Sequence, residues 1–537
     1  MTAPMIQRRR PRAAARPTTA DLHPNPPIRT ALAVALAASV TALVAAAPAA
    51  AQQAPVTPTE AQATAALDEA EQALEPTAPD AAPDASVALN QLAASVPALD
   101  GAERRRARGL LARPTDPNDR YGDSYPAGAP IASAESPHFC VFWVNDPVYM
   151  DAPSLVDANG TADGDGVPDY VESILQIAEF SYSIEVKPGT LGWIPPKRDT
   201  TGCGADPGAH ADVYLKQLGQ QGLFGYESPD FGQPRTRSQY GYLVLDDDYA
   251  QSEFGPFDDP LAPAKVTFAH EFNHLLQQAY DSFEDVWMFE STAVWSEEQV
   301  YPEINDYVNF VRSFASSPGS PITDVSAANG LKIYGTGVWN HWLDSGGGGY
   351  GTDLIRHSWE VSDRAKPADL ATASYDEAIR DQHGKGFSQE FVRFAAATSE
   401  WRAGAGGFPD GSLYPDMRRK GSLRRGREVR IALDHTAYRL FDVKPAGKLR
   451  LQAEVKGGTR AGIALVAREG DELNAKVKRK ARYLGDDGRG SVTLKHAKGY
   501  ERITAVIVNA DGRVRGFRGG DWVYANDNAK FDVSLSG

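Results

Sequence analysis

The sequence predicts an α+β protein in which strands and helices share the middle of the chain and strands alone form its C-terminal part. Between about residues 137 and 400, apolar runs of strand length come first and helical patterns come after them. From about residue 427, short alternating strands are separated by Gly and Asp turns, a pattern typical of a β-sandwich. Hydrophobic residues make up 42% of the chain and charged residues 23%, so a core can be buried.

Residues 1–51 have the order of a secretory signal peptide. Six arginines precede an apolar run at 31–47, and Ala49, Ala50 and Ala51 supply small residues for cleavage. The alternative is an N-terminal membrane anchor, but a run of 17 residues dominated by Ala and Val is short for a membrane span. We therefore expect cleavage after residue 51, export from the cell and no stable membrane insertion afterwards.

Residues 52–125 are rich in Ala and Pro and contain no aromatic residue before Tyr121. Two stretches, 59–75 and 86–99, have weak helical patterns. An arginine cluster at 104–108 offers a plausible processing site. The segment is interpreted either as a linker or as a pro-segment that masks the next region of the chain, and the sequence leaves both open.

Residues 126–405 carry the patterns expected of a small sheet with covering helices. Strands are predicted at 139–144, 212–215 and 241–245, the last of them as a sheet edge followed by a capping or surface run at Asp246–Asp248. Helices are predicted at 169–184, 264–280, 288–300, 304–316, 336–345, 352–364 and 387–400.

The chain has two cysteines, Cys140 and Cys203. In an oxidising compartment we expect them to pair, and two buried thiols are the alternative. A basic linker is predicted at 406–426 and a β-sandwich at 427–537. The formal net charge of −15 argues against nucleic acid or an anionic membrane surface as the main partner, because both favour cationic faces.

The segment from His270 to His274 reads His-Glu-Phe-Asn-His, inside the predicted helix 264–280. Residues i and i+4 of a helix share a face, so both imidazoles can bind one cation. Glu271 lies one residue along, where it can reach a water bound to that cation. This pattern predicts a zinc site with Glu271 as general base.

A catalytic zinc needs a third protein ligand and one open position. The pattern HExxHxxGxxH fails, because Gln277 and Tyr280 occupy the Gly and third His positions. Glu290 lies 16 residues beyond the second histidine, in an apolar segment where an unpaired carboxylate would be costly. We predict Glu290 as the third ligand and Glu297, two helical turns on, as an acceptor for a ligand histidine. Glu297 or Glu298 as ligand, and Glu290 in an ordinary ion pair, are the alternatives.

The HExxH motif followed by Glu290, Ala293 and Glu297 resembles the gluzincin zinc metallopeptidases. A closer resemblance, over about 137–400, is to a group of secreted bacterial proteins described as metalloproteases. The resemblance implies a zincin-like fold and a secreted zinc endopeptidase acting on protein or peptide substrates, by a zinc-activated water with Glu271 as base. Tyr334, followed by two residues and Gly337, looks like the tyrosine that assists the oxyanion in aminopeptidase-type members. A packed aromatic side chain is the alternative.

Carboxylates also concentrate around glycines at 161–172. Asp163, Asp165, Asp169 and Glu172 match positions 3, 5, 9 and 12 of a calcium-binding loop, although Thr161 stands where Asp is expected and Pro168 interrupts the loop. We expect Zn²⁺ as the main cofactor and Ca²⁺ as a second candidate, with a polar helix-capping turn as the alternative. For the whole chain, a zinc exopeptidase and a non-catalytic binding or adhesion protein are the competing functions.

Overall fold

The structure is a computed structural model, which describes residues 58–75, 85–116, 124–153, 166–233, 236–403, 407–470, 473, 475–518 and 521–537. The predicted signal peptide, residues 1–51, lies outside these ranges. Among the described residues, no helix combines the length and the apolar composition that crossing a membrane requires.

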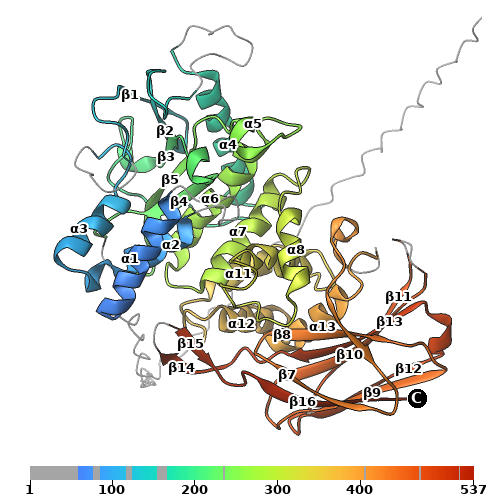
Figure 1. Ribbon diagram of the computed structural model, residues 1–537. Helices are drawn as coiled ribbons and strands as arrows, with labels where there is room; N and C mark the ends of the chain where they lie inside the picture. Colours follow the sequence, from blue (N-terminus) through green and yellow to red (C-terminus); the bar gives the residue numbers. More distant parts are fainter. Residues whose placement is uncertain are drawn as a thin grey trace, which may run out of the picture. The chain divides into compact units, whose positions relative to one another are not determined.

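A five-stranded mixed sheet lies in the first half of the chain, in the order β1-β2-β3-β5-β4 (Figure 1). Its strands are β1 (Ile131–Glu135), β2 (Phe139–Val144), β3 (Ala211–Lys216), β4 (Gly225–Pro229) and β5 (Gly241–Asp246). The three central strands β2, β3 and β5 are parallel, and β1 and β4 pair antiparallel at the two edges.

The prediction of β5 as the sheet edge is wrong, because β4 lies outside it. The sequence of β4 is Gly-Tyr-Glu-Ser-Pro, which has one large apolar residue and ends in proline. Such a composition is typical of an edge strand but carries little strand signal. The three predicted strands themselves are all present as β2, β3 and β5.

Helices bury both faces of this sheet, which explains why its central strands read as continuous apolar runs. Val213 and Leu215 of β3 belong to a hydrophobic core that includes α4 (Asp169–Glu185) and α6 (Ala262–Tyr280). Tyr214, between them, belongs to a separate core on the opposite face. The side-chain alternation of a strand thus divides the sheet between two cores.

The second core is built with the N-terminal helices α1 (Glu60–Leu74), α2 (Ser86–Ser95) and α3 (Gly101–Leu110). A capping box between Thr59 and Gln62 starts α1. The helices supply only aliphatic side chains, such as Leu67, Leu89 and Leu92, and the aromatic ones come from the sheet and from Tyr125, which precedes it. The N-terminal helices thus pack on the sheet, and whether 52–125 is a linker or a pro-segment stays a prediction.

The remaining helices follow β5 and form most of the main core. They are α5 (Gln251–Phe254), α6, α7 (Val286–Val300), α8 (Val308–Ser316), α9 (Lys332–Gly335), α10 (Gly337–Asp344), α11 (Asp353–Glu360), α12 (Ala371–His383) and α13 (Phe387–Thr398). All seven helices predicted between 169 and 400 have counterparts within a few residues. Helix α12 was not predicted, although its N-terminal half is buried.

The C-terminal region is rich in strands and contains two larger sheets and a hairpin. One sheet has the order β11-β10-β13-β8-β6 and the other β12-β9-β16-β7. Inward-facing residues of both sheets, such as Leu451, Ile463 and Phe531, share one hydrophobic core. The strands are β6 (Arg419–Leu423), β7 (Glu428–Leu433), β8 (Ala437–Val443), β9 (Lys448–Glu454), β10 (Ala461–Arg468), β11 (Val477–Tyr483), β12 (Arg489–Lys495), β13 (Arg502–Asn509), β14 (Val514–Arg518), β15 (Asp521–Tyr524) and β16 (Ala529–Ser536).

The segment 406–426 is not simply a basic linker, because β6 lies within it and pairs with β8. Arg419 explains why a basic residue belongs there: its guanidinium lies 3.3 Å from Glu400 and 3.3 Å from Asp442. Glu400 is 2% exposed and also lies near Arg468 of β10. Arg419 of this basic segment therefore forms ion pairs that connect the helical region with the C-terminal region.

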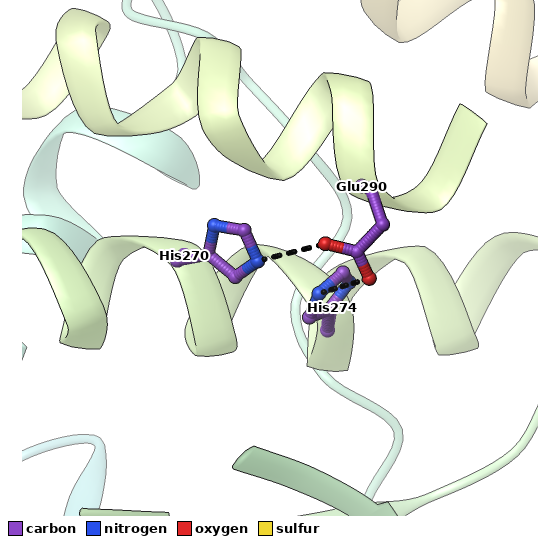
Figure 2. Close-up of side chains that lie close together, drawn as sticks. All are labelled: His270, His274 and Glu290. Carbon is purple, nitrogen blue, oxygen red and sulfur yellow. Dashed lines mark ion pairs between the residues drawn. The ribbon is translucent and has the colours of Figure 1, made fainter. Parts of the chain in front are cut away.

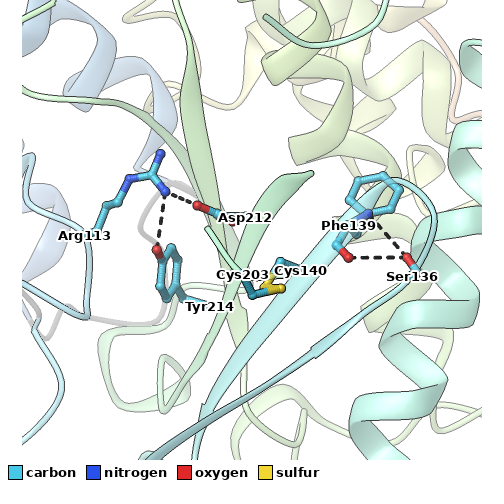
Figure 3. Close-up of a disulfide and its surroundings, with 7 residues drawn as sticks. All are labelled: Arg113, Ser136, Phe139, Cys140, Cys203, Asp212 and Tyr214. Atoms are coloured by element: carbon cyan, nitrogen blue, oxygen red, sulfur yellow. Dashed lines mark hydrogen bonds and ion pairs between the residues drawn. A yellow bond between two sulfur atoms is a disulfide. The ribbon is translucent and has the colours of Figure 1, made fainter. Parts of the chain in front are cut away.

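Cys140 and Cys203 form a disulfide, as predicted from export (Figure 3). Cys140 lies on β2, and Cys203 lies in the loop that leads to β3. The bond thus ties β2 to the later part of the long connection between two neighbouring parallel strands.

Candidate metal centre

Helices α6 and α7 carry the predicted metal ligands and pack side by side (Figure 2). The turn between them is organised by Asp281, whose carboxylate accepts hydrogen bonds from the Phe283 amide at 3.1 Å and the Ser362 hydroxyl at 3.0 Å. Asp281 also pairs with Arg237. This buried carboxylate ends α6 and returns the chain, so that α7 lies against the face of α6 that carries the histidines.

His270, His274 and Glu290 meet between the two helices. His270 Nε2 lies 3.3 Å from Glu290 Oε2, and His274 Nε2 lies 3.5 Å from Glu290 Oε1. The three residues are 6%, 1% and 0% exposed, and one ligand atom from each lies within 4.8 Å of the others. Two imidazole nitrogens and a carboxylate are the donor set of a catalytic zinc site with one open position.

The charge balance of the site also suits a cation. Burial lowers the pKa of His270, but the carboxylates of Glu290, Glu297 and Glu271 outweigh burial and raise that pKa well above its usual value. The three carboxylates thus favour a positive charge beside them that offsets their own. With a divalent cation present, the neutral imidazole can become a ligand and the cation takes over that role.

The outer nitrogen of each histidine is held by a neighbour. His270 Nδ1 lies 2.6 Å from Glu297 Oε1, which is the contact predicted for Glu297. His274 Nδ1 lies 2.8 Å from Gln277 Oε1. Such contacts orient metal-binding imidazoles and increase the basicity of the nitrogen that faces the metal.

Gln277 was not predicted to take part in the site, and its surroundings define its role. Its Nε2 donates to the Phe289 carbonyl at 3.1 Å, to Asn273 Oδ1 at 2.7 Å and to Thr292 Oγ1 at 2.8 Å. A backbone carbonyl can only accept, so the amide nitrogen faces Phe289 and the amide oxygen faces His274. The proton of His274 is then on Nδ1, and the lone pair of Nε2 points toward Glu290. The only sequence signal was the i+3 spacing from His274.

Glu271 is 1% exposed, and its Oε2 accepts a hydrogen bond of 2.8 Å from the hydroxyl of Ser86 on α2. The sequence did not indicate this contact, because 185 residues separate the two. Glu298, one of the alternative ligands, lies outside the triad. Burial and the nearby carboxylates of Asp410, Glu297 and Glu303 raise the pKa of Glu298 to about 8.

Tyr334 lies beside the triad, on α9. Its ring is stacked on that of His270, with centroids 6.1 Å apart and planes at 24°, and it is 3% exposed. Two glycines allow this placement: a Cβ on Gly335 would lie 2.5 Å from the Phe310 carbonyl, and one on Gly337 would lie 2.8 Å from Val294 Cγ1 of α7. The structure thus brings Tyr334 to the site, and its role with an oxyanion remains a prediction.

Two acidic segments differ in what the structure shows. Of the predicted calcium ligands, Asp163 and Asp165 lie outside the described residues, whereas Asp169 and Glu172 lie in the first turn of α4. The calcium site therefore stays a prediction. Asp246, Asp247 and Asp248 also lie close together. The carboxylate of Asp246 accepts hydrogen bonds from four backbone amides, which fits the capping role predicted for this run.

Comparisons with known proteins add little to this geometry. No family model matches the chain, and no curated protein sequence matches it. Among the solved structures that match, "Family 16 Carbohydrate Binding Module-2" has 15% identity and a TM-score of 0.13, over 21% of this chain and 74% of the matched chain. A TM-score this low establishes neither a shared fold nor a shared function.

Proposed function

We propose that the chain is a secreted zinc-dependent endopeptidase with a zincin-like catalytic region at 126–405 and a C-terminal β-sandwich. The observation that carries the proposal is the buried triad of His270, His274 and Glu290, with each imidazole held from behind. A cluster with a purely structural role would not require two imidazoles, each oriented by a neighbour, around one buried carboxylate. The disulfide between Cys140 and Cys203 supports the expected export.

Zinc held by these three side chains would supply a Lewis acid and a water of lowered pKa at neutral pH. Glu271 is the residue that would take the proton of the attacking water and deliver it to the leaving amine. Tyr334 would donate a hydrogen bond to the developing oxyanion. Glu297 and Gln277 would keep both histidines in the binding tautomer throughout.

The decisive experiment combines metal analysis with proteolysis of denatured casein. We would express the chain from residue 52, remove α1 and α2 by limited trypsin treatment at the arginines of α3, block the trypsin with a serine-protease inhibitor, and measure bound zinc by mass spectrometry. Glu271→Gln removes the base, and Glu253→Gln serves as a matched control at an exposed position on α5. We expect one zinc per chain in all three proteins, and casein cleavage only in the wild type and the control.

The products separate the competing functions. Internal peptides from one defined substrate would support an endopeptidase, whereas stepwise removal of single residues would identify an exopeptidase. A zinc-loaded, folded wild type that cuts no faster than Glu271→Gln would refute peptidase activity and favour the non-catalytic binding function. A wild type that binds no zinc at micromolar concentrations would contradict the assignment of the triad.

A further inference from the structure

Helix α2 packs on the edge strand β4 and also contacts α6, the helix that carries His270 and His274. Ser86 and Asn90 are four residues apart, so they share one face of this helix. Ser86 donates to Glu271 Oε2 on α6 at 2.8 Å and accepts from the backbone amide of Glu227 on β4 at 2.9 Å. Both partners of Ser86 are relevant to the site. Glu271 is the predicted base, and the backbone amide of Glu227 is a main-chain donor of the edge strand.

The second residue of this face repeats the arrangement about one turn further along. The amide nitrogen of Asn90 donates to Glu227 Oε2 at 3.1 Å, and its amide oxygen accepts from Gln278, also on α6. Ser86 and Glu227 are 0% exposed, and Gln278 is too. Side chains of α2 therefore bridge α6 and β4, and Ser86 uses a main-chain amide that an extended peptide on the edge strand would need.

The chain that follows α2 divides into an exposed basic part and a buried anchor. Arg104, Arg105 and Arg108 are exposed on α3. Arg113, only five residues after the last of them, is 10% exposed and pairs with Asp199, Asp212 and Asp230. Figure 3 shows the pair with Asp212. A cut in α3 would thus break the covalent link between α1–α2 and the rest of the chain, while the ion pairs of Arg113 remain intact and α1 and α2 are held only by non-covalent contacts.

We propose that α2 is an intramolecular inhibitor, which blocks the metal centre through Ser86 and is released by cleavage in α3. The inference rests on the proposed peptidase function and adds its regulation. The activating step is a hydrolysis by a trypsin-like serine endopeptidase. Water adds across the peptide bond after one of the exposed arginines and leaves a carboxylate on the arginine and a free amine on the next residue. Glu271 and the amide of Glu227 then become accessible to substrate.

The test uses the zinc-loaded chain from residue 52 and compares wild type, Ser86→Ala and Ser95→Ala. Ser95 is the matched control, since it is buried on the same helix, at its C-terminal end. The first measurement is the rate at which zinc passes to a chromogenic chelator, which does not depend on catalysis. The second is casein cleavage before and after trypsin treatment, with trypsin blocked and the cut sites determined by mass spectrometry.

We expect Ser86→Ala to release zinc and to cleave casein about tenfold faster than uncut wild type, because a hydrogen bond to a charged acceptor is lost from the blocking contact. Ser95→Ala should match wild type, and after cleavage in α3 all three should have equal casein activity. Equal rates for Ser86→Ala and Ser95→Ala before cleavage would refute the inhibitor. A casein activity of Ser86→Ala below that of wild type would also refute it, and would make Ser86 a support for Glu271.

The same measurements show separately whether the proposed peptidase function is wrong. If cut wild type holds zinc but leaves casein intact, the chain is not a peptidase. Faster zinc release from Ser86→Ala would then still support α2 as a cover of the metal centre, and unchanged release would refute that cover.

Discussion

Replacing Gln277 by leucine tests how the tautomer of His274 is set. The amide oxygen of Gln277 is 2.8 Å from Nδ1 of His274, and leucine has nearly the same volume but no acceptor. Loss of a hydrogen bond to the outer nitrogen of a metal-binding histidine typically weakens metal binding 10- to 100-fold. We therefore expect the zinc dissociation constant to rise by about that factor.

The same substitution has a cost in the metal-free protein. It removes the partner of two buried groups, Asn273 Oδ1 and His274 Nδ1, whereas Thr292 Oγ1 keeps the Trp359 indole N–H and the Phe289 carbonyl keeps the Thr292 hydroxyl. Each buried polar group left without a partner costs about 1–3 kcal/mol, so the free energy of unfolding should fall by about 2–5 kcal/mol. Urea unfolding of the apo-protein measures this loss, and competition with a chromogenic chelator measures zinc affinity under conditions where the variant is folded.

Gln278→Leu is the control for this experiment. Gln278 is the next residue on α6, equally buried, but it bonds to Asn90 and Glu227 instead of a histidine. It should lower stability without weakening intrinsic zinc binding. A zinc affinity of Gln277→Leu within twofold of wild type would refute the argument that Gln277 sets the tautomer.

Three further predictions concern other parts of the molecule. Tyr334→Phe should lower kcat on casein by about 10²-fold with unchanged zinc content, as for loss of one oxyanion donor, and an unchanged kcat would assign Tyr334 to packing alone. Burial raises the pKa of Glu227 to about 8, from an ordinary 4.5, so its contribution to stability is complete below pH 4.5 and disappears as the pH rises through 8. In urea unfolding, Glu227→Gln should remove a pH-dependent loss on the order of 5 kcal/mol over that interval. Replacing Cys140 and Cys203 together by alanine should cost about 3–4.5 kcal/mol, measured by unfolding with and without reductant, because the open connection regains its chain entropy.

The clustering of His270, His274 and Glu290 was predictable because its signals are local. His270 and His274 share a helical face within five residues, and Glu290 is a carboxylate in an apolar segment one helix away. Periodicity alone placed both helices to within a few residues. The contacts of Gln277 and Ser86 were not predictable in this way, since a glutamine and a serine are compatible with almost any environment and their partners are defined only by the packing of other elements.

The N-terminal helices show a second reason for failure. The segment 52–125 lacks aromatic residues before Tyr121, which suggested that it buries little. The structure shows that Leu89 and its neighbours bury well, because Tyr214, Tyr226 and Tyr242 of the sheet supply the bulky partners. Composition within one segment cannot reveal such complementarity. For β6, the opposite applies: a basic run suggested solvent exposure, although Arg419 has its carboxylates on two other elements.

The junction between α13 and the C-terminal sheets has a consequence for truncated gene products. Phe391 and Val392 of α13 belong to the same core as Leu440, Ala464 and Val506 of the sheet. The fit is tight, since a Cβ on Gly462 would lie 2.4 Å from Val392. A chain that ended near residue 405 would expose this face of α13 to water. We therefore expect such a product to be bound by chaperones or degraded. We also expect the helical region and the C-terminal region to occur together in one chain, instead of being exchanged between proteins as separate domains.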